Sequence, residues 1–139
     1  MNSQELMLGD LIRFSSEPYN FEDALRGKPV RVEGLRDEDG AIKVYERDTY
    51  YWSEDEDDFE PIPLTAEILK KNGWQEDDGW LVLKNGTKWN VSIAFHEDGY
   101  DIEIFGQNPL TTQFLGHLNY LHELQHILTF MKIRKEIEI

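Results

Sequence analysis

The sequence predicts an α+β protein in which short strands precede a short helix, an antiparallel β-meander and a carboxy-terminal helix. Three observations support this class. Apolar and polar residues alternate in several short segments, as in strands with one buried face. Asx-Gly pairs such as Asp78-Gly79, which favour tight hairpin turns, separate many of these segments. Near the carboxy terminus, apolar residues recur instead at intervals of three and four, the spacing of an amphipathic helix.

The first 53 residues are expected to form a small β-rich subdomain that resembles a barrel of the SH3-like kind. Its expected strands lie at residues 6–14, 29–33, 41–45 and 50–52. Gly9-Asp10 interrupts the first strand, and Asp39-Gly40 is the turn signal before the third. Residues 21–26 are compatible with a helical turn between the first two strands.

An acidic run follows and is expected to be a linker at residues 54–60. A run of like charges is most often a solvated loop, because the charges repel one another and favour water. The same run is a candidate surface for a partner protein with a basic face. The candidate residues are Glu54, Asp55, Glu56, Asp57 and Asp58.

Residues 61–139 are expected to form an α+β subdomain, with one continuous domain as the alternative. Thr65 is a candidate N-cap for a short helix at 66–71, which Asn72-Gly73 would end. Four antiparallel strands then follow at residues 80–84, 89–96, 100–104 and 111–118, with Asn85-Gly86 as the strongest hairpin signal. His96 falls on the polar side of the second of these strands and is expected to be exposed. A final helix is predicted at 120–131, and residues 132–139 could extend it or form a last strand.

Composition limits the classes of function. The chain has 139 residues, no cysteine and a formal net charge of −14, which excludes a thiolate metal site and disfavours direct binding to nucleic-acid phosphates or anionic membranes. No apolar run reaches the length of a membrane span, and the first residues lack the features of a signal peptide. We therefore expect a cytoplasmic protein with a protein partner, while the oligomeric state stays open.

The segment His122-Glu123-Leu124-Gln125-His126 matches the H-E-x-x-H pattern of zinc peptidases. In that pattern two histidines on one helical face bind Zn²⁺, and the glutamate is the general base. A catalytic zinc also needs a third protein ligand. Thr129 and Lys132 stand where the extended pattern has Gly and His, and few residues follow them. The sequence therefore favours no metal and no other cofactor.

A helical wheel places the two histidines away from the apolar face of the predicted helix. That face carries Leu121, Leu124, Ile127, Leu128 and Met131. Because the apolar face of such a helix packs on the core, the opposite side is expected to face solvent or a partner. The candidate partner-facing residues on this helix are His122, Gln125 and His126.

Two segments resemble motifs of a known group. Residues 61–74, from Pro61-Ile62-Pro63-Leu64-Thr65 to Gly73-Trp74, are similar to PIPLTEE-x-LLK-x-GF, and residues 120–130 are similar to YVHQLQNLYFAL. Both motifs occur in small uncharacterised proteins of gut Bacteroidales genomes, prophages and mobile elements. The resemblance implies no activity. In its second motif Gln and Asn stand at the positions of Glu123 and His126, which would make the H-E-x-x-H spelling coincidental.

Three functional hypotheses follow. The leading one is a non-enzymatic binding protein of a bacterium or its mobile elements, because no catalytic constellation is recognisable beside the heavy acidity. A specific case is an acidic DNA mimic or anti-defence antagonist of a nucleic-acid-binding protein. The third, which we favour least, is a zinc hydrolase that uses His122, His126 and Glu123.

Overall fold

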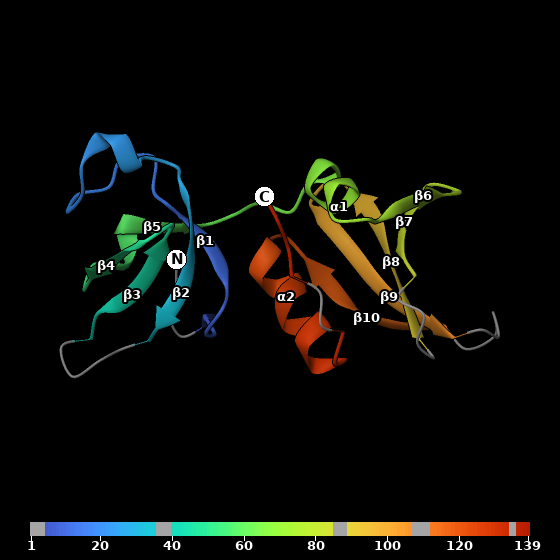
Figure 1. Ribbon diagram of the computed structural model, residues 1–139. Helices are drawn as coiled ribbons and strands as arrows, with labels where there is room; N and C mark the ends of the chain where they lie inside the picture. The colour runs from blue at the N-terminus through green and yellow to red at the C-terminus, as the bar shows by residue number, and fades with distance from the viewer. Residues whose placement is uncertain (1–4, 36–39, 85–88, 107–111, 134–135) are drawn as a thin grey trace. The chain divides into compact units, whose positions relative to one another are not determined.

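The computed structural model describes residues 5–35, 40–84, 89–106, 112–133 and 136–139 (Figure 1). The chain forms two compact units. The first comprises Met1–Ile62 and Tyr120–His126, and the second comprises Pro63–Asn119 and Ile127–Ile139. Each unit has one antiparallel sheet, and the chain has two α-helices among its described residues, which confirms the α+β class.

The sheet of the first unit has the order β4-β3-β2-β1-β5, with every neighbouring pair antiparallel. Its strands are β1 (Leu11–Phe14), β2 (Pro29–Gly34), β3 (Ile42–Glu46), β4 (Thr49–Ser53) and β5 (Phe59–Pro61). A short 3-10 helix, η2 (Asp23–Leu25), lies between β1 and β2, where the sequence allows a helical turn. Among the described residues this sheet is open, with β4 and β5 at its edges.

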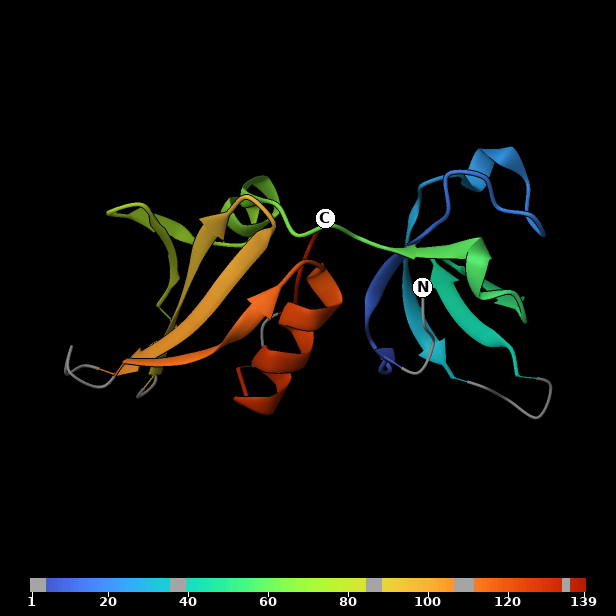
Figure 2. The ribbon, with the colours of Figure 1, turned by 180° about the vertical axis from the view of Figure 1, so that it is seen from behind.

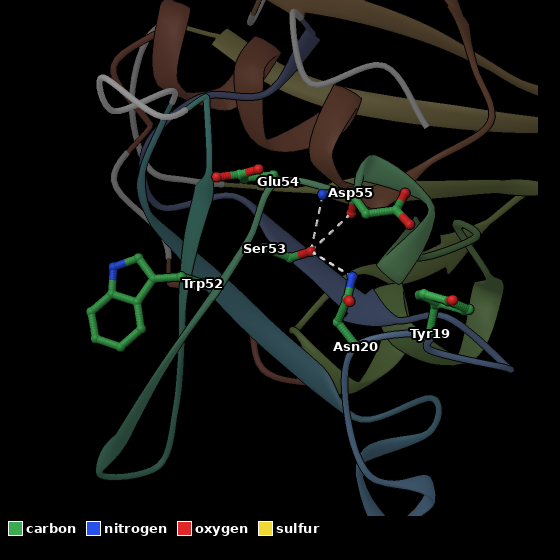
Figure 3. A pocket seen from close by; sticks show the side chains of 6 residues that line it. All are labelled: Tyr19, Asn20, Trp52, Ser53, Glu54 and Asp55. Atoms are coloured by element: carbon green, nitrogen blue, oxygen red, sulfur yellow. Dashed lines mark hydrogen bonds between the residues drawn. The ribbon is translucent and has the colours of Figure 1, made fainter.

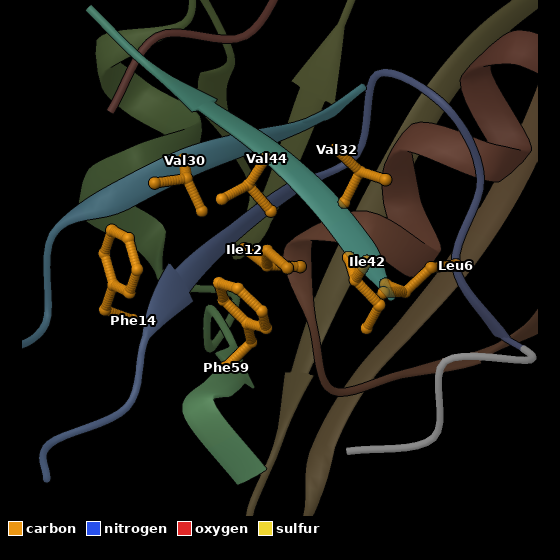
Figure 4. Packing of buried hydrophobic residues seen from close by; sticks show 8 residues of the cluster. All are labelled: Leu6, Ile12, Phe14, Val30, Val32, Ile42, Val44 and Phe59. Carbon is orange, nitrogen blue, oxygen red and sulfur yellow. The ribbon is translucent and has the colours of Figure 1, made fainter. Parts of the chain in front are cut away.

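The core of the first unit lies on one face of this sheet (Figure 4). The buried side chains are Leu6, Ile12, Phe14, Val30, Val32, Ile42, Val44 and Phe59. On β2 and β3 the buried positions alternate with Arg31 and Lys43, as period-two burial requires. Phe14 also makes edge contacts with Phe21 and Tyr51, at centroid distances of 5.0 and 5.3 Å. Burial of each large side chain contributes roughly 1.5–3 kcal/mol.

Residues 54–60, predicted as an acidic linker, are instead part of this first unit. They form a second 3-10 helix, η3 (Glu56–Asp58), and then strand β5, which pairs with β1. The reason is Phe59, whose side chain is only 1% exposed in the core. The division between the units falls after Ile62 rather than at the acidic run.

The sheet of the second unit has the order β10-β9-β8-β7-β6 and follows the chain as a meander. Its strands are β6 (Gln75–Asp77), β7 (Trp80–Leu83), β8 (Trp89–His96), β9 (Gly99–Gly106) and β10 (Thr112–Leu118). The turn signal Asp78-Gly79 is confirmed, because both residues have positive φ, as a tight hairpin requires. The turn signals Asp39-Gly40 and Asn85-Gly86 fall wholly or partly outside the described residues.

The predicted alternation along the meander is confirmed for the middle of its apolar row but not at its end, because Phe95 is 41% exposed. Val91, Ile93 and Ile102 are all 0% exposed. The opposite face is less uniformly wet than the alternation predicts, because Ser92 is 6% exposed and lies beside buried Val82 in the register. His96 is exposed on that face, as predicted from its place in the strand.

Helix α1 (Ala66–Lys71) begins and ends where the sequence predicts. The Thr65 hydroxyl accepts a hydrogen bond from the Ile68 amide at 3.2 Å, which is an N-cap. Gly73 has a φ of 89°, the left-handed conformation that ends helices, and Trp74 returns to the core with 3% exposure.

Helix α2 comprises Leu121–Phe130. The described residues after it, 131–133 and 136–139, neither extend the helix nor form a strand. Lys132 has a φ of 59°, which stops the helix. Asn72 then holds the last residues by two bonds, donating Nδ2–H to the Glu138 carbonyl at 2.7 Å and accepting the Glu138 amide at 2.8 Å. Figure 2 shows both α-helices from behind. No helix in the described chain has the length and apolar character needed to span a membrane.

Candidate functional site

The H-E-x-x-H segment forms the first turns of α2 and belongs to the first unit. Its glutamate caps the helix: Glu123 Oε1 accepts a hydrogen bond from the Tyr120 amide at 3.0 Å. This is the reciprocal half of a capping box, in which an acidic residue at the third helical position satisfies the amide before the helix. The carboxylate that a zinc peptidase would use as general base therefore has a structural role here.

Gln125 and His126 bind the residues around the start of β1. Gln125 accepts the Leu11 amide at 2.8 Å and donates to the Gly9 carbonyl at 3.3 Å. His126 Nε2 lies 2.7 Å from Oδ2 of Asp10, a carboxylate that also accepts the Met7 amide at 2.8 Å. These contacts give both side chains a structural role within the first unit, and the His126 side chain is only 27% exposed.

The exposed position predicted for His122 is wrong, because this residue is 2% exposed. Its ring stacks on Tyr120 at a centroid distance of 5.9 Å and meets the ring of His126 edge-on at 5.6 Å. Its Nδ1 has no hydrogen-bond partner among the described residues. Burial lowers the pKa of His122, so the ring is held in its neutral form.

No three histidine, aspartate or glutamate side chains among the described residues are placed to hold a metal ion. Within H-E-x-x-H, His126 Nε2 is turned to Asp10 and Glu123 to the Tyr120 amide. In this arrangement Glu123 caps the helix and His126 holds the helix to Asp10, which favours a structural role over metal binding.

Within the acidic run, Asp58 differs from its neighbours because it is 0% exposed. Its Oδ1 accepts the amides of Tyr19 and Asn20 at 2.7 and 3.0 Å, and its Oδ2 accepts the Asn20 side-chain amide and the Ser53 hydroxyl, both at 2.5 Å. Burial by itself raises the pKa of Asp58, but the bonds from Ser53, Asn20 and Tyr19 lower it overall. Asp58 is therefore a buried anchor, and its predicted place on an exposed partner surface is wrong.

The rest of the run is divided between structural and exposed positions. Glu54 and Asp57 are exposed, as predicted, while Asp55 and Glu56 are half-buried. Asp55 Oδ1 caps η3 by accepting the Asp57 amide at 2.9 Å. The acidic run is thus an ordered turn, and only part of its charge faces solvent.

Beside this turn lies a solvent-facing pocket of about 640 Å³ in the first unit (Figure 3). It is lined by Tyr19, Asn20, Trp52, Ser53, Glu54 and Asp55. One side is the loop after β1 and the other is the end of β4 with the residues that follow it. Because Asp58 binds both Asn20 and Ser53, its carboxylate fixes the two sides relative to each other. The result is a preformed pocket that carries two carboxylates.

The indole of Trp52 extends away from Ser53 and Asn20 (Figure 3) onto the outer face of the β3–β4 hairpin. There it neighbours Tyr50 at a ring-centroid distance of 6.5 Å, and Tyr50 neighbours Tyr45 at 4.9 Å. We call these three rings the aromatic face. The ammonium of Lys43 lies over it, 4.4 Å from the Tyr50 centroid and 5.4 Å from the Trp52 centroid.

Sequence reasoning placed the candidate residues in two separate sets, and the structure does not bring those sets together into one site. The sequence patterns do not indicate four further residues, whose roles depend on contacts between distant parts of the chain: Asp10, Tyr19, Asn20 and Lys43. One signal was present: the aromatic run Tyr50-Tyr51-Trp52 sends its first and third rings outward and Tyr51 toward the core. This alternation places two neighbouring aromatic rings, those of Tyr50 and Trp52, on the exposed face of the strand.

A polar cluster in the second unit joins two histidines through one carboxylate. His96 Nε2 lies 2.7 Å from Asp101 Oδ2, and His117 Nδ1 lies 2.9 Å from Asp101 Oδ1. His117 Nε2 also faces the Asp98 carbonyl at 3.0 Å. Both ring nitrogens of His117 face oxygen acceptors, and only the protonated ring can donate to both, so these contacts favour the protonated form. The Asp101 bond, and then the Asp98 carbonyl, raise the pKa of His117.

Replacing His117 with glutamine is expected to destabilise the protein in a pH-dependent way. A histidine whose pKa is raised on folding adds stability that is fully present below its unfolded pKa of about 6.5 and disappears as pH rises through the folded value. Thermal unfolding of the natural protein and of the His117→Gln variant, measured from acidic to alkaline pH, checks this prediction. The difference in Tm should be largest at acidic pH and shrink toward alkaline pH. A difference that is constant or grows with pH would contradict the assignment.

Comparison with protein-family models, with curated proteins and with solved structures finds no significant match for this chain.

Proposed function

We propose that the chain is a non-catalytic binding protein, and that its partner presents a basic segment to the pocket between Asn20 and Asp55. The observation that carries the proposal is the position of Glu54 and Asp55 in a preformed pocket beside the exposed indole of Trp52. Carboxylates attract ammonium and guanidinium groups, and an aromatic ring face adds a cation–π contact. The net charge of −14 adds a long-range attraction for a basic partner.

The wider context of the proposal follows from the sequence. We infer that the first unit is a small barrel of the SH3-like kind, which the strand order β4-β3-β2-β1-β5 supports. The resemblance of residues 61–74 and 120–130 to proteins of Bacteroidales and their mobile elements supports a bacterial or mobile-element origin. A cytoplasmic location without cofactor is part of the same proposal.

A peptide titration with charge variants tests this function. Fluorescein-labelled octalysine is titrated with the protein at low salt, and its anisotropy is measured. The paired substitutions Glu54→Gln and Asp55→Asn should weaken binding by about three- to tenfold. Asparagine is also a good N-cap, so the turn at η3 should remain intact.

The matched control carries Asp77→Asn and Glu97→Gln, two exposed acids of the second unit. Both double variants change the net charge by the same amount, so the control should bind octalysine nearly as well as the natural protein. Equal weakening by the two pairs would show attraction to the overall charge alone and would contradict a site at the pocket. An octaglutamate peptide should not bind.

A specific form of this proposal is an acidic antagonist that covers the nucleic-acid site of a basic protein. The exposed carboxylates of Glu54 and Asp57 and the net charge favour it. In that case the protein should compete with DNA for its basic partner, and neutralising residues 54–57 should abolish the competition. Undiminished competition after neutralisation would reject this form.

A further inference from the structure

The outer face of the β3–β4 hairpin points to a more specific partner chemistry. Resting on the proposed function, we propose that Tyr50 and Trp52 form a stacking site for an arginine side chain of the partner's basic segment. In the free protein this site is occupied by Lys43, which the incoming guanidinium replaces.

The strand register places these side chains together. Lys43 is paired with Trp52, and Tyr45 is paired with Tyr50. Residues directly opposite in an antiparallel pair point to the same face of the sheet. The two neighbours of Lys43 on β3, Ile42 and Val44, are 1% and 0% exposed, so their face is the core and the face with Lys43 is the outer one.

Both rings are open to a ligand. Tyr50 is 46% exposed and Trp52 is 56% exposed, although large aromatic side chains are usually covered in a folded chain. The Lys43 ammonium already lies over both rings at cation–π distance, so their electron-rich faces are available to a positive charge. The fold therefore contains an intramolecular example of the contact that we propose for the partner.

The ring geometry favours arginine over lysine. The two rings lie side by side on a sheet surface, with an interplanar angle of 38°, and do not surround a hole. A planar guanidinium stacks on such an open ring face and is weakly hydrated, whereas a compact, strongly hydrated ammonium gains little without enclosure. For the same reason Lys43 is a weak occupant that an arginine can displace.

Trp52 also connects the aromatic face with the acidic pocket, because it lines that pocket together with Glu54 and Asp55. An arginine stacked on Trp52 would leave the next basic residues of an extended segment within reach of these carboxylates. The surface thus combines ring faces and charge for one kind of ligand, an extended segment with arginine among its basic residues.

The first test compares labelled octaarginine with octalysine. The natural protein should bind octaarginine about fivefold more tightly. Trp52→Leu, which keeps an apolar side chain on the strand but removes the ring, should abolish this preference. Phe114→Leu is the matched control, since Phe114 is a similarly exposed aromatic (58%) on β10 of the second unit, and it should retain the preference. Thermal unfolding checks that both variants fold.

The second test concerns Lys43. Lys43→Met should tighten octaarginine binding by about threefold more than Lys28→Met does. Lys28 is an exposed lysine of the same unit, and replacing it changes the net charge by the same amount. In the Trp52→Leu protein the two lysine substitutions should have the same effect. Lys43→Met binding that equals or falls below that of Lys28→Met would overturn the displacement of Lys43.

The outcomes separate this inference from the function on which it rests. If the Glu54/Asp55 pair matters for octalysine but octaarginine has no Trp52-dependent advantage, the pocket stands and the arginine site is rejected. If the Glu54/Asp55 pair has no effect beyond its charge-matched control, the proposed function itself fails.

Discussion

Replacing Asp58 with alanine is expected to lower the free energy of unfolding by about 3 kcal/mol or more. The carboxylate is fully buried and accepts bonds from two backbone amides, one side-chain amide and one hydroxyl. Its removal takes away the ionised acceptor that all four donors share, and a hydrogen bond to a charged group contributes roughly 1.5–3 kcal/mol. Urea unfolding measures the loss.

The neighbouring Asp57 provides the control, because it is exposed and Asp57→Ala should change stability by no more than about 0.5 kcal/mol. The effect of Asp58 should also depend on pH. Its pKa is lowered on folding, so its contribution is present above the unfolded value of about 3.9 and is lost as pH falls through the folded value. Equal stability of the two alanine variants at neutral pH would contradict the role of Asp58.

Replacing Asp10 with alanine is expected to cost about 2 kcal/mol. Asp10 is 2% exposed and joins the Met7 amide to the His126 ring, so the substitution leaves both donors unpaired. The effects of Asp10→Ala and His126→Ala should not add, because each removes the same bond, and a double-mutant cycle should give a coupling of about 1 kcal/mol or more.

The double-mutant cycle, combined with the addition of Zn²⁺, tests whether the H-E-x-x-H segment has a structural role or binds zinc. If His126 is an anchor for Asp10, adding Zn²⁺ should not raise the Tm of the natural protein. If instead the histidines bind zinc, ligand binding to the folded state should raise the Tm. Additive effects of the two alanine substitutions together with such a rise would contradict the structural role.

The parts of the fold that local pattern determines could be predicted from the sequence. Thr65 caps α1 and Asp78-Gly79 turns between β6 and β7, because cap and turn preferences act over three or four residues. Asp58 could not be distinguished from Asp57 in this way. Its burial depends on Asn20, which is 38 residues away in the sequence.

The polar side of α2 shows the same limit. A helical wheel assumes one buried face, and it correctly places Leu121 and Leu124, both 0% exposed, in a core. It fails for His122, which is covered as well and stacks on Tyr120. The partner of His126 is Asp10, 116 residues earlier, and no periodicity within the helix could identify it.

The most direct test of the binding site is to map octaarginine onto the protein by two-dimensional NMR. We predict shifts of the Trp52 indole signal and of the backbone amides of residues 19–20 and 53–55, which line the pocket. The amides of Asp77 and Glu97 in the second unit should stay unchanged. Shifts at these control positions equal to those at the pocket, or an unmoved Trp52 indole, would contradict the account.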